Sequence, residues 1–202
     1  MLLFAHAGIP LGVAWLSRKA IVRGKLGSSW GAVSNPADCA AENRAGVGSL
    51  TTWLDYRFLF VGSILPDIID KPLGTWLLRD ALGNGRVFGH TLLFAVLLVV
   101  AGIYLCVSRR RLALLWLSFG CMAHLCLDQM WANQSTLLWP LYGWGFDKMD
   151  VSNWLETVLT SLTTEPSVYV PEIIGLLFLG AFFFNLVRLG KLYSFLRTGE
   201  AY

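Results

Sequence analysis

Charged side chains are scarce in this chain of 202 residues, and their scarcity excludes most classes of soluble protein. Asp, Glu, Lys and Arg make up 14% of the residues, whereas soluble domains contain about 25%. Hydrophobic residues make up 55%, and the net charge is only +3. So few charges cannot cover the surface of a soluble particle, and the many large apolar residues exclude intrinsic disorder. The composition therefore predicts an integral membrane protein.

The chain also lacks a cysteine framework and a basic patch. None of the four cysteines belongs to a CxxC pair, which is typical of thiols that pack as small hydrophobic groups. The basic residues are scattered, and their one run, Arg109–Arg111, lies between two apolar segments. Such a run is typical of a membrane topology signal, so we expect no nucleic-acid partner. An HExxH protease motif is missing as well.

Long apolar runs without the alternation of barrel strands predict an all-α fold. We expect a polytopic membrane bundle of about five helices, forming a single domain over residues 1–202. The last three segments have about 17–20 residues, enough for a hydrocarbon core of about 30 Å. The second segment is weaker, and Pro66 is expected to break it. The five predicted segments are Leu2–Leu16, Tyr56–Ile69, His90–Val107, Leu112–Trp131 and Ile173–Leu189.

The distribution of basic residues predicts the orientation of these segments. With Arg109–Arg111 in the cytoplasm, twelve Lys and Arg residues lie inside and four lie outside. The N-terminus of the first helix is then outside. Residues 24–52 form an irregular cytoplasmic loop, and residues 132–171 form an outer loop rich in aromatic residues. We expect a protein of a prokaryotic-type plasma or inner membrane.

Histidine and aspartate residues interrupt the apolar segments. Ionisable side chains are costly inside a membrane, so they are candidates for function. The scheme above brings all of them to the outer side. Their types suit Zn²⁺, or alternatively Mn²⁺ or Fe²⁺, and six candidates allow one or two ions. The six predicted metal ligands are His6, Asp67, Asp70, His90, His124 and Asp128.

Two local spacings support this hypothesis. His124 and Asp128 are four residues apart and share one helix face. Asp67 and Asp70 follow Pro66, where the backbone is freed from the regular helical ladder. Each residue alone is also compatible with a hydrogen-bonded packing role or an interfacial position. Their common depth is what favours a metal site.

Four short motifs follow one another over about residues 1–140. They are His6, the segment GSILPDIIDKP at Gly62–Pro72, GHTLLF at Gly89–Phe94 and HLCLD at His124–Asp128. This series resembles the YdjM-like membrane-bound metal-dependent hydrolases. Its order also resembles that of the soluble zinc-dependent phospholipase C and P1-nuclease superfamily. The resemblance implies that His6, Asp67, His90, His124 and Asp128 are metal ligands.

The chain departs from the family pattern at two places. Many YdjM-like members carry a histidine where this chain has Gly85, although Arg86 is kept. No histidine follows His124, so one or two metal ions fit better than three.

These features together predict a metal-dependent hydrolase of phosphoester bonds in lipid or lipid-linked substrates at the outer membrane face. Asp67 or Asp70 would orient a water molecule or accept its proton, and Arg86 would pair with a phosphate oxygen. Two alternatives stay open. One is a non-enzymatic membrane scaffold whose metal site joins the helices. The other is a metal or proton transporter, although its His and Asp residues would be expected at the bilayer centre.

Overall fold

The computed structural model describes residues 3–29, 54–148, 154–199 and 201. Within these residues the chain is helical and contains no strand, which confirms the predicted all-α class. The α-helices are α1 (Leu3–Ser29), α4 (Tyr56–Pro72), α5 (Leu92–Arg109), α6 (Ala113–Leu127), α7 (Gln134–Leu137), α8 (Trp154–Thr164), α9 (Pro166–Arg188) and α10 (Leu192–Thr198). Short turns of other helix types are η1 (Leu73–Leu77), η2 (Phe88–His90) and η3 (Met130–Ala132).

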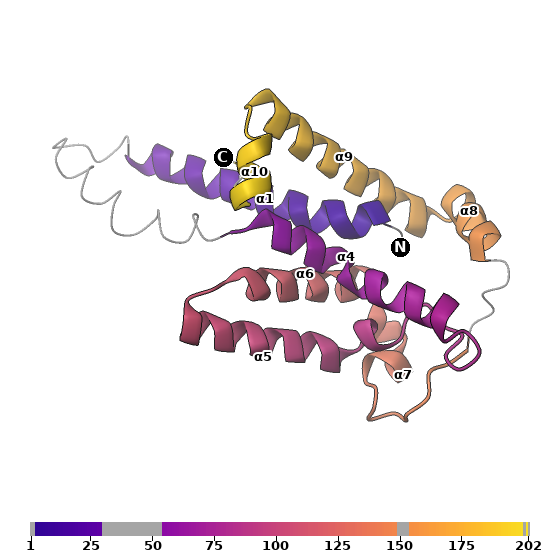
Figure 1. Ribbon diagram of the computed structural model, residues 1–202. Coiled ribbons are helices and arrows are strands. Elements are labelled where there is room, and N and C mark those ends of the chain that lie inside the picture. Colours follow the sequence, from indigo (N-terminus) through magenta and orange to yellow (C-terminus); the bar gives the residue numbers. More distant parts are fainter. Residues whose placement is uncertain (1–2, 30–53, 149–153, 200, 202) are drawn as a thin grey trace.

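The long helices pack side by side in the order α9, α1, α4, α6 and α5 (Figure 1). Along the chain, the long helices α1, α4, α5, α6 and α9 alternate in direction, so one end of the bundle gathers five helix ends. These are the N-terminal ends of α1, α5 and α9 and the C-terminal ends of α4 and α6. The predicted ligands lie at these helix ends, so the packing order positions the candidate site.

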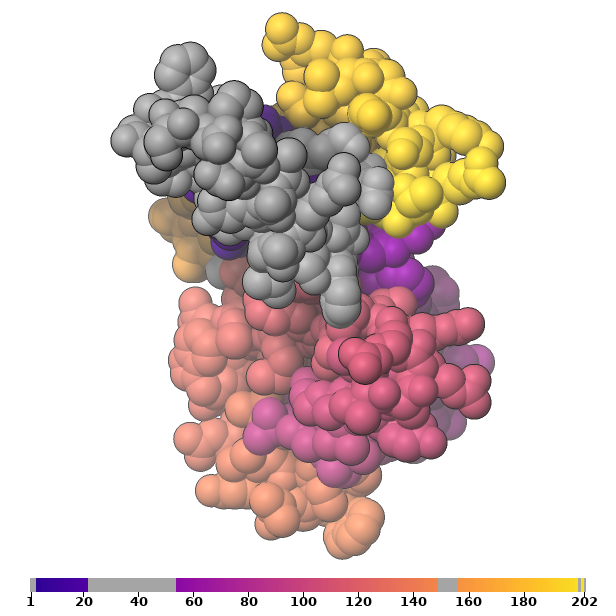
Figure 2. Space-filling model, turned by 90° about the vertical axis from the view of Figure 1, so that its left-hand side faces the viewer, coloured from indigo at the N-terminus to yellow at the C-terminus, as the bar shows by residue number. Residues whose placement is uncertain are grey.

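The opposite end of the bundle carries the turn between α5 and α6 and the C-terminal helix α10. Figure 2 looks at this end, with the turn in its lower half and α10 above. Arg110 adopts a left-handed conformation (φ 54°) that ends α5 within this turn. The basic run Arg109–Arg111 is therefore remote from the predicted ligands, as the expected topology requires.

Among the described residues, two helices are long and apolar enough to cross a membrane. They are α5, with 18 residues, and α9, with 23 residues. Helix α6 is also apolar but has only 15 residues. Only 11% of the residues of α5 are buried inside the protein. Most of the surface of α5 is therefore not covered by the other helices. An apolar helix with so little protein cover is typical of one that faces lipid.

The observed helices differ from the predicted segments at four boundaries. Helix α6 ends at Leu127, four residues before the predicted end at Trp131. Pro66 does not break the second segment, since α4 continues to Pro72. Neighbouring helices can support the backbone at such a proline. Helix α1 extends to Ser29, so the first part of the predicted loop 24–52 is helical, while residues 30–52 lie outside the described residues. Helix α9 begins at Pro166, within the predicted loop 132–171, because proline suits the first helical turn.

Glycine allows α4 and α6 to approach with their backbones in contact. A Cβ on Gly120 of α6 would overlap the carbonyl oxygen of Leu59 and the backbone nitrogen of Ser63 in α4. In the reverse direction, a Cβ on Gly62 of α4 would overlap the carbonyl oxygen of Leu117 in α6. Small residues are the usual means by which membrane helices pack closely. This contact places His124 of α6 against α4.

We predict that Gly120→Leu lowers the stability of the protein, because α4 and α6 must separate to admit the side chain. Overpacking of this kind typically costs about 1–3 kcal/mol. The measurement is the midpoint of thermal unfolding in detergent. The matched control is Gly180→Leu, since a Cβ at Gly180 in α9 meets no atom within 4 Å. Equal midpoints for the two variants would contradict this role of Gly120.

Candidate metal centre

All six predicted ligands gather at one end of the bundle, although they come from separate parts of the chain. His6 lies in the first turn of α1, the two aspartates lie in the C-terminal half of α4, and His90 ends η2. His124 lies near the end of α6, and Asp128 is the residue that caps this helix. The three histidines are each at most 1% exposed. The tertiary fold therefore converts dispersed motifs into one buried polar cluster.

One group of possible metal ligands consists of His6, His124 and Asp128. Their ligand atoms all lie within 4.8 Å of one another. His6 Nε2 lies 3.0 Å from Asp128 Oδ1, and the rings of His6 and His124 lie 4.0 Å apart. The i, i+4 spacing in α6 explains how His124 and Asp128 both reach this point. The pairing predicted from HLCLD is thus present in the structure.

A second group shares His124 with the first and adds Asp67 and His90. His90 Nε2 lies 3.2 Å from His124 Nε2. Asp67 Oδ1 lies 3.7 Å from His90 Nε2 and 4.0 Å from His124 Nε2. His90 Nε2 also lies 3.7 Å from Asp128 Oδ2, which connects the two groups. Imidazole nitrogens and carboxylate oxygens therefore converge on one region.

The hydrogen bonds behind two imidazoles assign their tautomers. His124 Nδ1 lies 2.7 Å from the carbonyl oxygen of Ser63, which can only accept a hydrogen bond. His90 Nδ1 lies 2.7 Å from Asp70 Oδ2. Both Nδ1 atoms therefore donate, and in the neutral rings both Nε2 atoms carry lone pairs. Two lone pairs that face each other at 3.2 Å repel, so a cation near them would stabilise the arrangement.

Asp70 occupies a different place from the one that the sequence predicts. Its carboxylate accepts hydrogen bonds from the backbone N–H groups of Val87 (2.7 Å), Gly89 (2.8 Å) and His90 (3.1 Å), and from His90 Nδ1. It is fully buried and belongs to neither ligand group. With both oxygens engaged by donors, Asp70 orients His90 from behind. The geometry favours a positioning role over the predicted roles as ligand or base.

We predict that Asp70→Asn weakens metal binding by about 10–100-fold, the usual effect of losing a carboxylate behind a histidine ligand. An amide cannot accept from all four donors with the strength of a carboxylate, so the η2 backbone and the His90 ring would lose their fixed orientation. Titration of the metal-free protein with Zn²⁺ measures this change. Unchanged affinity in a folded variant would show that His90 is oriented by other contacts.

Two cationic side chains form the rim of the cluster. Arg86 Nε lies 2.8 Å from Asp128 Oδ2, and Lys71 Nζ lies 2.7 Å from Asp67 Oδ2. The Arg86 and Lys71 side chains are 36% and 40% exposed, whereas the Asp128 and Asp67 side chains are 3% and 13% exposed. Lys71 and Arg86 are therefore the exposed charges of the cluster, and each is paired with a less exposed carboxylate. Their remaining N–H groups suit an anionic ligand.

The sequence model of the family described as YdjM inner membrane protein matches residues 3–197. This match covers nearly the whole chain. The chain belongs to the YdjM inner membrane protein family. No curated protein and no solved structure matches it. Membership in the YdjM family agrees with the apolar helices α5 and α9, whereas the resemblance to the phospholipase C and P1-nuclease superfamily stays a prediction.

In this YdjM family member, sequence reasoning missed two residues that support the cluster. The carbonyl of Ser63 leaves no signal in a sequence, because every residue has one. Glu172 was detectable as an acidic residue beside an apolar run. It is 6% exposed in α9, and its Oε2 accepts a hydrogen bond of 2.9 Å from the backbone N–H of Phe4. Glu172 thereby holds the first turn of α1, which carries His6.

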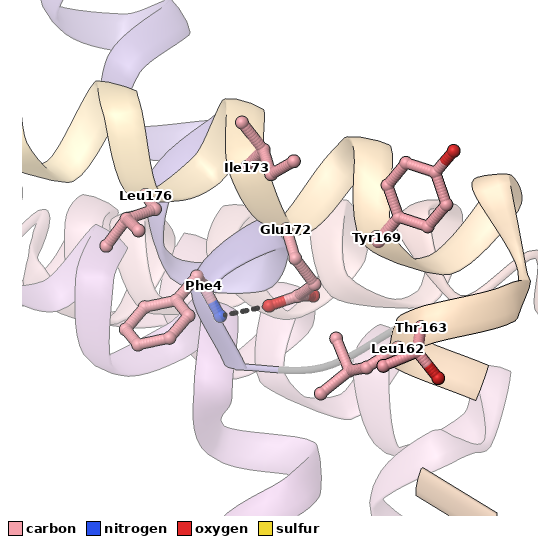
Figure 3. Close-up of a pocket in the computed structure, with 7 residues that line it drawn as sticks. All are labelled: Phe4, Leu162, Thr163, Tyr169, Glu172, Ile173 and Leu176. Atoms are coloured by element: carbon pink, nitrogen blue, oxygen red, sulfur yellow. Dashed lines mark hydrogen bonds between the residues drawn. The ribbon is translucent and has the colours of Figure 1, made fainter. Parts of the chain in front are cut away.

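Glu172 also contributes to a pocket of about 410 Å³ between α1, α8 and α9 (Figure 3). No predicted ligand lines this pocket. Figure 3 shows the Glu172 carboxylate turned toward Phe4, with apolar side chains of α9 along one wall. The seven lining residues are Phe4, Leu162, Thr163, Tyr169, Glu172, Ile173 and Leu176.

Proposed function

We propose that this inner membrane protein is a metal-dependent hydrolase of phosphoester bonds in lipid or lipid-linked substrates. The observation that carries the proposal is the convergence of three imidazoles and two carboxylates beneath a cationic rim. Metal-assisted phosphoester hydrolysis can use these ligands to hold the ion and these cations to bind the phosphate.

The residues that would hold the metal come from the two ligand groups. Three neutral imidazoles with carboxylate oxygens suit Zn²⁺ best, with Mn²⁺ or Fe²⁺ as alternatives. Because the groups share His124, they represent either one ion or two ions with unequal ligand sets. When bound, the metal lowers the pKa of a water molecule toward neutrality and polarises a phosphoryl oxygen. Of the five residues in these groups we assign His6, His90, His124 and Asp128 as the ligands, which leaves Asp67 free to act as a base.

Asp67 is the best-placed general base in the cluster. It is more exposed than Asp128, and Lys71 binds only its Oδ2 atom. Its Oδ1 atom faces the imidazoles and can accept a proton from water. Asp70 is unsuited to this step, because all four of its hydrogen bonds come from donors within the protein.

Arg86 is the best-placed residue to bind the phosphate. Its Nε atom holds Asp128, and a guanidinium has further N–H groups in the same plane. Within the described part of the chain, the Arg86 side chain makes no other polar contact. An incoming phosphate oxygen would therefore find charge-assisted donors beside the ligand groups. The same residue would bind substrate and orient Asp128.

The position of the cluster favours a lipid substrate. His90 lies two residues before the first residue of α5, one of the two helices in the described residues that are long and apolar enough to cross a membrane. The cluster is therefore close to the edge of the hydrocarbon core, which is the depth of lipid headgroups. A phosphoester of a membrane lipid or of a lipid carrier would reach it by lateral diffusion.

We further propose that the cluster faces the outer side of the membrane, because the basic residues concentrate at the other end of the bundle. A cysteine at the exposed position Glu165, which precedes α9, should react with a membrane-impermeant thiol reagent in intact cells. A cysteine at Arg110 should react only after the cells are permeabilised. The reverse pattern would place the cluster on the cytoplasmic side.

Turnover of lipid phosphoesters by the purified protein tests the proposed activity. Phospholipid and polyprenyl-phosphate substrates in detergent should be hydrolysed, and a chelator should stop the reaction until metal is added back. If no substrate is turned over in a chelator-sensitive way while chelation still lowers the unfolding temperature, the metal is structural. The protein would then be a scaffold.

A further inference from the structure

The segment at residues 138–146 forms an exposed apolar tip at the same end of the protein as the metal cluster. It reads Leu-Trp-Pro-Leu-Tyr-Gly-Trp-Gly-Phe and contains no charged residue. Leu141, Tyr142 and Trp144 are 84%, 65% and 80% exposed. We call this segment the aromatic tip. In water, so much exposed apolar surface would favour aggregation.

Ring contacts and a hydrogen bond hold the side chains of the aromatic tip in place. The rings of Trp139 and Phe146 stack at 5.7 Å, and Trp139 Nε1 donates a hydrogen bond of 3.2 Å to the carbonyl of Trp144. Phe88 packs edge-on against both stacked rings, at 5.4 and 5.1 Å. Because Phe88 begins η2, which ends at His90, the tip is attached directly to the metal cluster.

Polar contacts hold the residues that follow the tip. The carbonyl of Asp147 accepts a hydrogen bond of 2.8 Å from Asn84 Nδ2, and its Oδ2 accepts one of 2.7 Å from Ser135 Oγ. Lys148 Nζ donates to the carbonyl of Asp80 at 2.9 Å. The position of the tip relative to the bundle is thus determined by the fold.

The aromatic tip continues an apolar surface that faces lipid. Helix α5 begins four residues after Phe88, and its exposed apolar residues run along the length of the helix. Phe88 is itself 37% exposed, so it joins this surface to the tip. The exposed apolar residues on α5 include Leu92, Leu93, Val96, Leu97, Val100 and Ile103.

We propose that the aromatic tip inserts into the headgroup region of the bilayer that α5 crosses. Tryptophan and tyrosine favour this region, because their rings are apolar and each has one polar group. Through Phe88 and η2, insertion would set Arg86 and the metal cluster at the depth of lipid phosphates. The proposal goes beyond the proposed function, since insertion requires no catalysis.

Fluorescence quenching in nanodiscs tests the insertion. Single cysteines are placed at Leu141 or Tyr142, whose side chains make no ring contact, in a full-length variant whose four native cysteines are alanine. Each is labelled with an environment-sensitive fluorophore. Lipids with a nitroxide near the headgroup should cause a large loss of fluorescence at both positions, and lipids with a mid-chain nitroxide should cause a smaller loss.

Two control positions show how labels inside the bilayer and in water respond to the quenchers. A label at Val100, which is exposed on α5, should lose more fluorescence with the mid-chain nitroxide. A label at Arg110 should be quenched only by iodide in the water. If the labels at Leu141 and Tyr142 behave like the label at Arg110, the proposal is wrong. The result does not depend on hydrolase activity, so a failure of the proposed function leaves this test intact.

Discussion

Replacement of His124 with alanine is expected to abolish stable metal binding, because His124 is the one residue that both ligand groups share. Loss of a partner behind a ligand usually costs about 10–100-fold in affinity, and loss of the ligand itself should cost more. The ligand atom that disappears is Nε2, which lies 3.2 Å from His90 Nε2. Metal content after purification and Zn²⁺ titration of the metal-free protein measure the effect.

The matched control for His124→Ala is Cys126→Ala, because Cys126 is an exposed residue two positions further along α6. A bound ion stabilises the folded state in proportion to the logarithm of its concentration over its dissociation constant. Chelation should therefore lower the unfolding temperature of the wild type and the control, but not that of His124→Ala. Full metal content in folded His124→Ala would show that the ligands lie elsewhere.

The second large effect is expected for Asp67→Asn, which should lower phosphoester hydrolysis by about 10²–10⁴-fold, the usual contribution of a general base. The amide keeps the size of the side chain and one oxygen, but it cannot accept a proton at neutral pH. Three imidazoles and Asp128 remain to hold the metal, so metal content should change much less than in His124→Ala. The measurement is kcat for a lipid phosphoester at saturating metal.

Comparison with Asp70→Asn separates a base from a positioning residue. Asp70 orients His90, so its asparagine variant should recover much of its activity when the metal concentration is raised. Asp67→Asn should not recover, because the missing group acts on a proton. If both variants recover equally with added metal, neither aspartate is the base.

Local features allowed much of the site to be predicted from the sequence. An i, i+4 spacing survives in any helix, so HLCLD was sufficient to pair His124 with Asp128. The high cost of ionisable groups in a membrane was sufficient to predict all six residues as candidates for function. The six residues lie at one end of the bundle because helices that alternate in direction along the chain bring defined ends together. Helix periodicity acts within one segment, and the cost of ionisable groups applies to every membrane protein. Neither prediction therefore requires the tertiary structure.

Other features depended on contacts between distant segments. The sequence could not distinguish Asp67 from Asp70, because the difference lies in the η2 backbone some 20 residues away, where Val87, Gly89 and His90 donate to Asp70 alone. The pairing of Arg86 with Asp128 joins two segments in the same way. The ends of two helices also differ from the sequence prediction, since α1 continues to Ser29 and α9 begins at Pro166, where proline suits the first helical turn.

Sequence alone determined that this protein is an all-helical membrane protein with a His and Asp cluster at one end, since hydropathy and periodicity act along a single segment. Only the tertiary structure decided which atoms meet. Backbone contact at Gly62 and Gly120 sets the register of α4 against α6, and this register places His124 beside the carbonyl of Ser63. The physical reason is that hydrogen-bond partners and tautomers depend on distances of a few tenths of an ångström between segments, which packing alone determines.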